Sequence, residues 1–189
     1  MEGVFPKGTG GFIQPEKVIQ QMPIKLGMRI ANFGCGHGHF TFIIAKMIGP
    51  EGKIYAIDIL KEALQAVGGR AKIENLTNIE LIRANLETAG SSTLDNNSMD
   101  MVLLINILFQ SQKKEDIVKE ARRVLKEGGD LVVIDWDPEA SKMGPQEQGW
   151  RIEKEQMTKL VEEIGFKLDK SLDTGFFHYG FIFKKNYNT

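Results

Sequence analysis

A regular alternation of short apolar runs with longer amphipathic segments constrains the fold of this chain more than any other feature. The runs that predict strands are residues 28–33, 53–58, 79–84, 100–105 and 131–134. The segments that predict helices are residues 40–48, 61–73, 113–126 and 152–164. Strands that alternate with helices are typical of a parallel sheet with helices on its faces. A chain of 189 residues can bury one sizeable core, so we predict a single α/β domain over residues 1–189.

Both ends of the chain depart from this alternation. Residues 166–184 contain two strand-like runs around Asp173-Thr174-Gly175, which predicts a hairpin or a pair of edge strands. A short helix is expected from Pro15, because proline suits the first helical position. Residues 1–14 are rich in glycine and predict an arm that folds over the site as a lid or, alternatively, a disordered tail. Gly128-Gly129 is expected to cap the helix at residues 113–126.

The charge balance and the cysteine content limit the function classes. The chain has 24 Lys and Arg against 25 Asp and Glu, so it supplies no field that holds a polyanion or a membrane surface. Cys35 is the only cysteine, which excludes an intrachain disulfide and favours a reducing compartment. The chain shows neither a signal peptide nor an apolar run of membrane length, so we expect a cytoplasmic protein without a membrane partner. Its histidines and cysteine lack ligand spacing, so no metal site is expected.

A glycine-rich loop follows the first predicted strand. From Asn32 to His39 it reads Asn-Phe-Gly-Cys-Gly-His-Gly-His. Glycines here allow a tight turn and let a ligand approach backbone N–H groups. A dinucleotide fingerprint needs a third glycine where His39 stands, which disfavours a nicotinamide dehydrogenase. The loop by itself predicts either a nucleotide-like ligand or a purely structural turn.

A carboxylate ends the second predicted strand. Asp58 follows Gly38 by 20 residues, where a carboxylate can accept both hydroxyls of a ribose. The alternative is an aspartate that only begins a turn or caps the next helix. Taken together, the loop and the carboxylate predict a cofactor that contains a ribose.

Four stretches of this sequence resemble successive motifs of the class I S-adenosylmethionine-dependent methyltransferases. They are Ile30-Ala31-Asn32-Phe33-Gly34-Cys35-Gly36-His37-Gly38, Ile57-Asp58, Ser98-Met99-Asp100-Met101-Val102 and Ala121-Arg122-Arg123-Val124-Leu125-Lys126-Glu127-Gly128-Gly129. The last stretch is typical of the subgroup that acts on small molecules, and the resemblance covers about residues 10–185. It implies a Rossmann-like three-layer sandwich whose seven-stranded sheet is mostly parallel, with an antiparallel last strand.

The resemblance also implies a set of residues that bind S-adenosyl-L-methionine. They are Asn32, Gly34, Cys35, Gly36, Asp58, Ile59, Asn85, Leu86 and Asn106. Residues 34–36 would lie against the methionine part of the cofactor, Asp58 would bind the ribose, and Ile59 would pack on the adenine ring. Asn85, with Leu86 beside it, would lie near the adenine amino group. Asn106 would offer a backbone group to the methionine amino group.

Two of these positions depart from the family pattern. Asn32 stands where the family usually has an acidic residue, and Asn85 stands where aspartate is common. An amide keeps a hydrogen-bonding carbonyl but loses the charge, so we expect weaker attraction of the cofactor's positive groups and a modest affinity. Binding is still expected, because Asp58 and the glycines remain.

Methyl transfer from a sulfonium is an in-line displacement that chiefly requires an acceptor held in the correct orientation. A general base is needed only where the acceptor must lose a proton. Weak candidates for this role are His37, His39, His178 and Tyr179. The alternatives are a polar helix cap for the first two and an exposed edge-strand pair for the last two.

We therefore predict an S-adenosylmethionine-dependent enzyme that methylates a small-molecule acceptor. The alternatives are a methyltransferase for RNA, DNA or protein, and a non-catalytic protein that binds S-adenosylmethionine. Asn106-Ile107-Leu108-Phe109 lacks the two prolines typical of enzymes that methylate base amino groups. The cofactor-binding fold also takes up nearly all of the chain, which leaves little to recruit a large partner.

Overall fold

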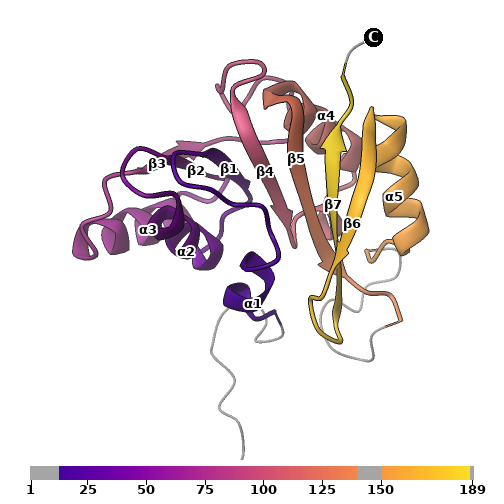
Figure 1. The fold of residues 1–189 in the computed structure, drawn as a ribbon, viewed down its shortest axis with the longest axis horizontal. Helices are drawn as coiled ribbons and strands as arrows, with labels where there is room; N and C mark the ends of the chain where they lie inside the picture. The colour runs from indigo at the N-terminus through magenta and orange to yellow at the C-terminus, as the bar shows by residue number, and fades with distance from the viewer. Residues whose placement is uncertain (1–12, 140–149, 188–189) are drawn as a thin grey trace, which may run out of the picture.

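One seven-stranded sheet organises the computed structural model, which describes residues 13–139 and 150–187 (Figure 1). The strands are β1 (Arg29–Phe33), β2 (Lys53–Asp58), β3 (Ile79–Arg83), β4 (Met99–Ile105), β5 (Leu125–Trp136), β6 (Phe166–Leu172) and β7 (His178–Lys185). The helices are α1 (Pro15–Ile19), α2 (His39–Ile48), α3 (Lys61–Ile73), α4 (Lys114–Val124) and α5 (Lys154–Glu163), with a short 3-10 turn, η2 (Leu108–Gln110). The predicted lid at residues 1–14 lies almost wholly outside the described residues, and the extent of the domain stays a prediction.

The strand order is β3-β2-β1-β4-β5-β7-β6. Strands β1 to β5 pair in parallel, whereas β7 runs antiparallel to both of its neighbours, β5 and β6. This arrangement confirms the predicted Rossmann-like sheet with an antiparallel last strand. Because consecutive parallel strands end at the same edge, the loops after β1, β2, β3 and β4 are brought together there.

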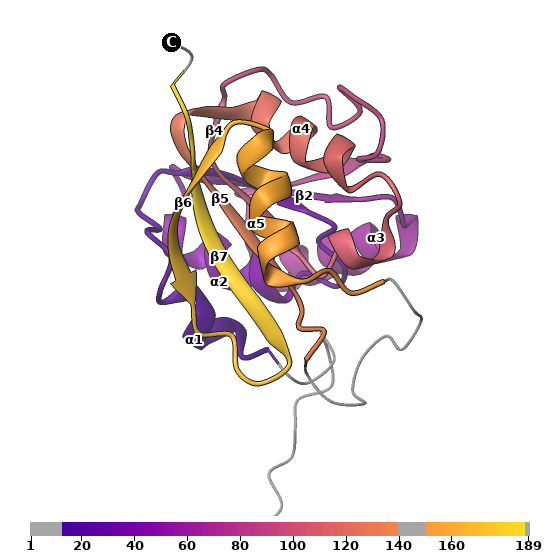
Figure 2. The same ribbon diagram turned by 90° about the vertical axis from the view of Figure 1, so that its right-hand side faces the viewer.

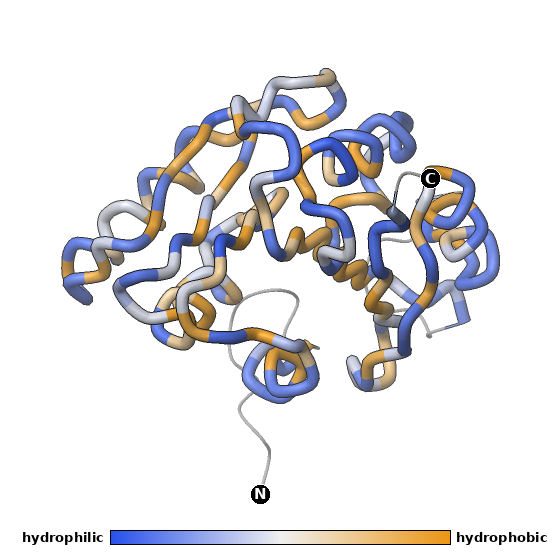
Figure 3. The backbone as a smooth tube through the Cα atoms, turned by 45° about the horizontal axis from the view of Figure 1, so that its top comes forward, coloured by the Kyte–Doolittle hydropathy of each residue, from blue (hydrophilic) through white to orange (hydrophobic). Residues whose placement is uncertain are grey.

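Helices cover both faces of the sheet (Figure 2), and separate apolar clusters are buried beneath them, one on one face and two on the other. Side chains of α4 and α5 pack on one face, while α1, α2 and α3 pack on the other. On α4, Ile117, Ala121 and Val124 recur at helical spacing and are buried, whereas the charged residues other than Glu120 occupy the opposite side. The apolar inner strands lie among more polar loops in Figure 3. Every helix within the described ranges is too short or too polar to cross a membrane.

The start of β5 differs from the prediction of a helix at residues 113–126 capped by Gly128-Gly129. The helix ends at Val124, and Leu125 is already extended and paired with Met99 of β4. The register between β4 and β5 then shifts, and pairing resumes between Met101 and Asp130. The glycine pair lies within this irregular part of β5, where the positive φ of Gly128 (72°) suits a bulge.

The C-terminal hairpin is confirmed, but its second strand is not at the edge of the sheet. Strand β7 lies between β5 and β6, so neither of its edges is free, and most of its side chains are buried. His178 is 3% exposed and Tyr179 is 4% exposed. The alternative of an exposed edge-strand pair for these two residues is therefore wrong.

Candidate cofactor-binding site

Three glycines with positive φ shape the loop between β1 and α2. They are Gly34 (71°), Gly36 (51°) and Gly38 (80°). A Cβ atom on Gly34 would lie 2.8 Å from Cδ1 of Ile107, so only glycine lets the two loops meet this closely. A Cβ atom on Gly36 would meet no atom within 4 Å, because this residue faces open space. The loop therefore presents bare backbone to a cavity at its middle glycine.

Asp58 is held by this loop and by the turn that follows β2. Its Oδ2 accepts the N–H of Gly36 at 2.9 Å, and its Oδ1 accepts the N–H of Leu60 at 3.0 Å. The side chain is 8% exposed. Each carboxylate oxygen keeps a lone pair beyond these bonds, so the structural role in the turn and a role towards a ligand are compatible.

A cavity of about 570 Å³ lies where β1, β2, β3 and β4 end, a volume within the usual range for sites of small molecules. The nine residues predicted to bind the cofactor all line it: Asn32, Gly34, Cys35, Gly36, Asp58, Ile59, Asn85, Leu86 and Asn106. His37 and His39 line it as well, whereas His178 and Tyr179 do not. The structure thus brings together residues that are up to 74 positions apart (32 to 106).

The three asparagines of the cavity are held differently. Asn32 donates from Nδ2 to Oγ1 of Thr41 at 3.0 Å and so ties β1 to α2. Asn85 accepts the N–H of Glu87 on Oδ1 at 3.1 Å, which forms a tight turn after β3. Asn106 has a positive φ of 53°, and its Oδ1 is buried without a hydrogen-bond partner in the described part of the chain. An orphan buried acceptor at a cavity wall fits a ligand donor.

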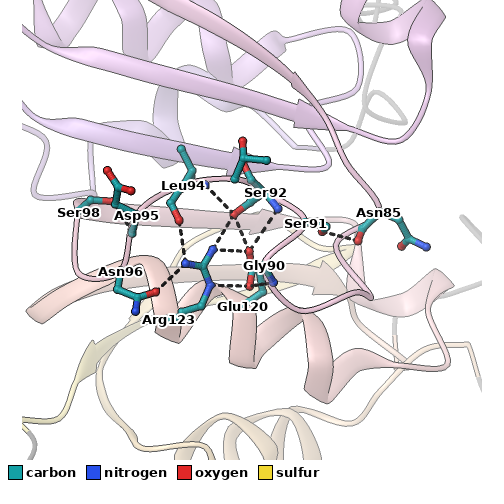
Figure 4. Close-up of polar contacts among 11 residues, drawn as sticks. Asn85, Gly90, Ser91, Ser92, Leu94, Asp95, Asn96, Ser98, Glu120 and Arg123 are labelled. Atoms are coloured by element: carbon teal, nitrogen blue, oxygen red, sulfur yellow. Dashed lines mark hydrogen bonds and ion pairs between the residues drawn. The ribbon is translucent and has the colours of Figure 1, made fainter.

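A polar cluster that the sequence did not reveal fixes the loop between β3 and β4, which carries Asn85 (Figure 4). Glu120 of α4, 2% exposed, accepts hydrogen bonds from the Gly90 N–H at 2.9 Å and from the Ser92 O–H at 2.5 Å. Arg123, one turn further along α4, donates to Glu120 at 2.8 and 2.9 Å and to the Leu94 carbonyl at 2.8 Å. Burial raises the pKa of Glu120, but the hydrogen bonds from Arg123 and Ser92 outweigh it and lower the pKa to about 2.

The four weak candidates for proton transfer fall into two groups. His37 is exposed and His39 half-buried at the start of α2. Burial, and then the positive charge of Arg70, lowers the pKa of His39. His178 packs on Trp136 with ring centroids 4.1 Å apart, and burial lowers its pKa to about 4. Burial raises the pKa of Tyr179, so both members of the second group are neutral at pH 7.

The thiol of Cys35 and the question of a metal site can also be settled for the described residues. Burial, followed by the charge of Asp58, raises the pKa of the Cys35 thiol to about 12, so the thiol stays protonated and is a poor nucleophile. Among residues 13–139 and 150–187, no three His, Cys, Asp or Glu side chains are placed to hold a metal ion.

Comparison with known proteins identifies the family. A family model described as a methyltransferase domain matches residues 24–174. The chain belongs to this methyltransferase family. The demethylmenaquinone methyltransferase of Lactococcus lactis subsp. lactis (strain IL1403) is 30% identical over 119 residues, which cover 63% of this chain and 46% of the relative. That of Geobacillus stearothermophilus is 30% identical over 118 residues, 62% of this chain and 49% of the relative. The chain thus spans about half the length of these curated relatives.

Solved structures agree on the fold. A SAM-dependent methyltransferase from Aquifex aeolicus superimposes with a TM-score of 0.82 at 24% identity, covering 92% of this chain and 90% of its own. The cyclase SpnF superimposes with a TM-score of 0.78 at 15% identity, covering 92% and 81%. Because one neighbour is named a methyltransferase and the other a cyclase, the fold alone does not decide the reaction.

Proposed function

We propose that this protein transfers a methyl group from S-adenosylmethionine to a small-molecule acceptor. The observation that carries the proposal is the convergence of all nine predicted cofactor residues on one cavity at the carboxyl edge of the sheet. Membership of a methyltransferase family supports the same reaction.

The residues of the cavity fit this cofactor. Gly36 leaves open space beside its backbone, where a ligand can approach without meeting a side chain. Asp58 is oriented by two backbone N–H groups, which prepares its carboxylate for the hydroxyls of a ribose. The unpartnered Oδ1 of Asn106 is an acceptor for a ligand amino group. The cofactor supplies an already activated methyl group, so the chain has to bind, orient and exclude water.

Several features support a small acceptor over a macromolecule. The curated relatives are demethylmenaquinone methyltransferases, whose named acceptor is a small molecule. The net charge of −1 offers no general attraction for nucleic acid. A cytoplasmic location, expected from the single cysteine, is part of this proposal.

If the substrate must lose a proton when it is methylated, His39 is the best-supported general base among the four candidates. It lines the cavity, and its lowered pKa keeps the imidazole neutral and able to take up a proton at pH 7. His37 also lines the cavity and is the second candidate. His178 and Tyr179 lie outside the cavity walls and are less well supported.

Thermal denaturation with and without ligands tests the cofactor. We expect S-adenosylmethionine and S-adenosylhomocysteine to raise the midpoint and NAD to leave it unchanged. Asp58→Ala should lose this stabilisation, whereas Asp169→Ala, on the distant strand β6, should keep it. The proposal fails if neither adenosyl ligand stabilises the protein.

Methyl release from radiolabelled cofactor into a metabolite extract tests the reaction. Labelled small molecules are the expected product. Tight cofactor binding without any transfer would instead favour a non-catalytic binding protein, and labelling of added RNA or protein would favour a macromolecular acceptor.

A further inference from the structure

A buried carboxylate outside the cavity contacts one of the cavity's walls. Asp135 is 2% exposed and lies one residue before the end of β5. Its Oδ2 accepts the N–H of Phe109 at 2.9 Å, and its Oδ1 accepts the N–H of Trp136 at 2.8 Å. Phe109 belongs to η2, within the segment from Asn106 to Ser111 that we call the β4–α4 loop. Asp135 therefore links β5 to the middle of this loop.

The β4–α4 loop forms the cavity wall that faces the glycine loop. Four of its residues line the cavity: Asn106, Ile107, Gln110 and Ser111. Ile107 packs so closely on Gly34 that an added Cβ atom there would lie 2.8 Å from its Cδ1. A shift of the β4–α4 loop would therefore change the space next to residues 34–36, where the methionine part of the cofactor is expected.

The loop is held at three places. At its start the Asn106 N–H continues the sheet by donating to the Ile134 carbonyl at 2.9 Å. At its end Lys114 donates to the Ser111 carbonyl, and the Ser111 hydroxyl donates to Glu87 at 2.6 Å. Asp135 holds the middle, through the N–H of Phe109. Among these contacts, the hydrogen bond from Phe109 to Asp135 is the one that holds the middle of the loop, and its acceptor is a buried ionisable side chain.

This carboxylate is costly to the fold. Burial raises the pKa of Asp135 to about 7, although the N–H groups of Trp136 and Phe109 and the charge of Lys114 act in the opposite direction. Tyr179, its register partner on β7, adds no charge, because burial keeps its phenol protonated. Removing the carboxylate would also cost stability, because the N–H groups of Phe109 and Trp136 would be left without an acceptor.

We propose that Asp135 is a positioning residue, which holds the β4–α4 loop against the glycine loop and thereby sets the affinity for the cofactor. The inference rests on the proposed function, because the affinity in question is for an adenosyl ligand. Asp135 does not touch the cavity itself and acts through Phe109. A preformed wall lowers the ordering cost of binding, which is the physical basis of the effect.

The test compares Asp135→Ala, Asp135→Asn and the matched control Asp130→Asn. Asp130 is a second buried aspartate of β5 whose pKa is also raised by burial, but it pairs with Lys184 at 2.6 Å instead of the loop. The affinity for S-adenosylhomocysteine is measured by calorimetry, the exchange rate of the Phe109 amide by NMR in the ligand-free protein, and global stability by urea unfolding.

We expect Asp135→Ala to bind S-adenosylhomocysteine at least about tenfold more weakly, because a hydrogen bond to a charged acceptor is lost. Its Phe109 amide should exchange faster, and its unfolding midpoint should fall, because the N–H groups of Phe109 and Trp136 lose their acceptor. Asp135→Asn should recover part of the affinity, because its side-chain oxygen still accepts from Phe109. Asp130→Asn should bind like the wild type. A loss of affinity that Asp135→Asn partly restores, together with normal binding by Asp130→Asn, separates positioning from a merely structural role.

A pH titration gives a second readout. Wild-type affinity should fall as the pH drops below about 7, where Asp135 takes up its proton, and Asp135→Asn should lack this step. A folded Asp135→Ala protein with wild-type affinity and unchanged Phe109 exchange overturns this proposal alone. A wild-type protein that binds no adenosyl ligand overturns the proposed function and, with it, this inference.

Discussion

Replacing Glu120 by glutamine should destabilise the protein in a way that depends on pH. A pKa lowered from 4.5 to about 2 corresponds to about 3 kcal/mol in favour of the charged form in the folded state. The Arg123 side chain is 28% exposed, so solvent screens part of this interaction, and about 2 kcal/mol is a better expectation. Glu120→Gln keeps the shape and one acceptor oxygen but removes this contribution.

The sign of the pH dependence follows from the direction of the shift. The folded-state pKa of Glu120 lies below its unfolded value, so the stabilisation is fully present above pH 4.5 and is lost as the pH falls towards 2. Urea unfolding followed by circular dichroism should therefore show a difference of about 2 kcal/mol between wild type and Glu120→Gln at pH 7. That difference should shrink steadily below pH 4.5.

The control is Glu115→Gln on the same helix. Glu115 pairs with Lys119 at 3.2 Å, but both side chains are more than half exposed, so this substitution should change the free energy of unfolding little at any pH. An equally large effect of both substitutions, or a Glu120→Gln effect that does not vary with pH, would refute the reasoning.

Three further predictions concern the glycine loop and its surroundings. Asn32→Asp should tighten binding of S-adenosylmethionine in calorimetry, because a carboxylate attracts its positive groups, and unchanged or weaker binding would contradict this. Gly34→Ala should lower the free energy of unfolding by roughly 1–3 kcal/mol in urea titrations, because of its positive φ and the contact with Ile107. The control is Gly69→Ala on α3, where an added Cβ atom meets no other atom; it should leave the free energy of unfolding unchanged or raise it. Cys35 should react slowly with iodoacetamide at pH 8 in the folded protein and quickly in urea, because its pKa of about 12 keeps the thiol protonated; equal rates would argue against burial.

The glycine loop and Asp58 could be predicted from their places around the ends of apolar runs, whereas the other cavity residues followed from the resemblance to methyltransferase motifs. Gly34 follows β1, Ile59 follows β2, and Asn106 follows β4. The ends of parallel strands meet at one edge, which explains why residues matched to separate motifs lie together. The bounds of β2 and α3 agree with the prediction for the same reason, since their patterns are local.

What the sequence did not reveal depends on contacts between distant segments. Glu120 and Ser92 are 28 residues apart. Glutamate and serine are residue types that are usually exposed, so nothing in the sequence marks either one as buried. The early start of β5 follows from pairing of Leu125 with Met99, which overrides the helical pattern of residues 113–126. The burial of His178 follows from strand order, and no local pattern sets the place of β7 in the sheet.

The insertion of β7 between β5 and β6 also orders the assembly of the protein during synthesis. Strand β5 is buried throughout its second half and apolar there except for Asp135, yet its partner on one side is the last of the seven strands in chain order. Until residues 178–185 emerge, β5 is an open edge with unpaired N–H and C=O groups, which is a template for pairing between chains. A chain that ends before β7 should therefore keep a cofactor cavity built from β1 to β4 but aggregate through β5.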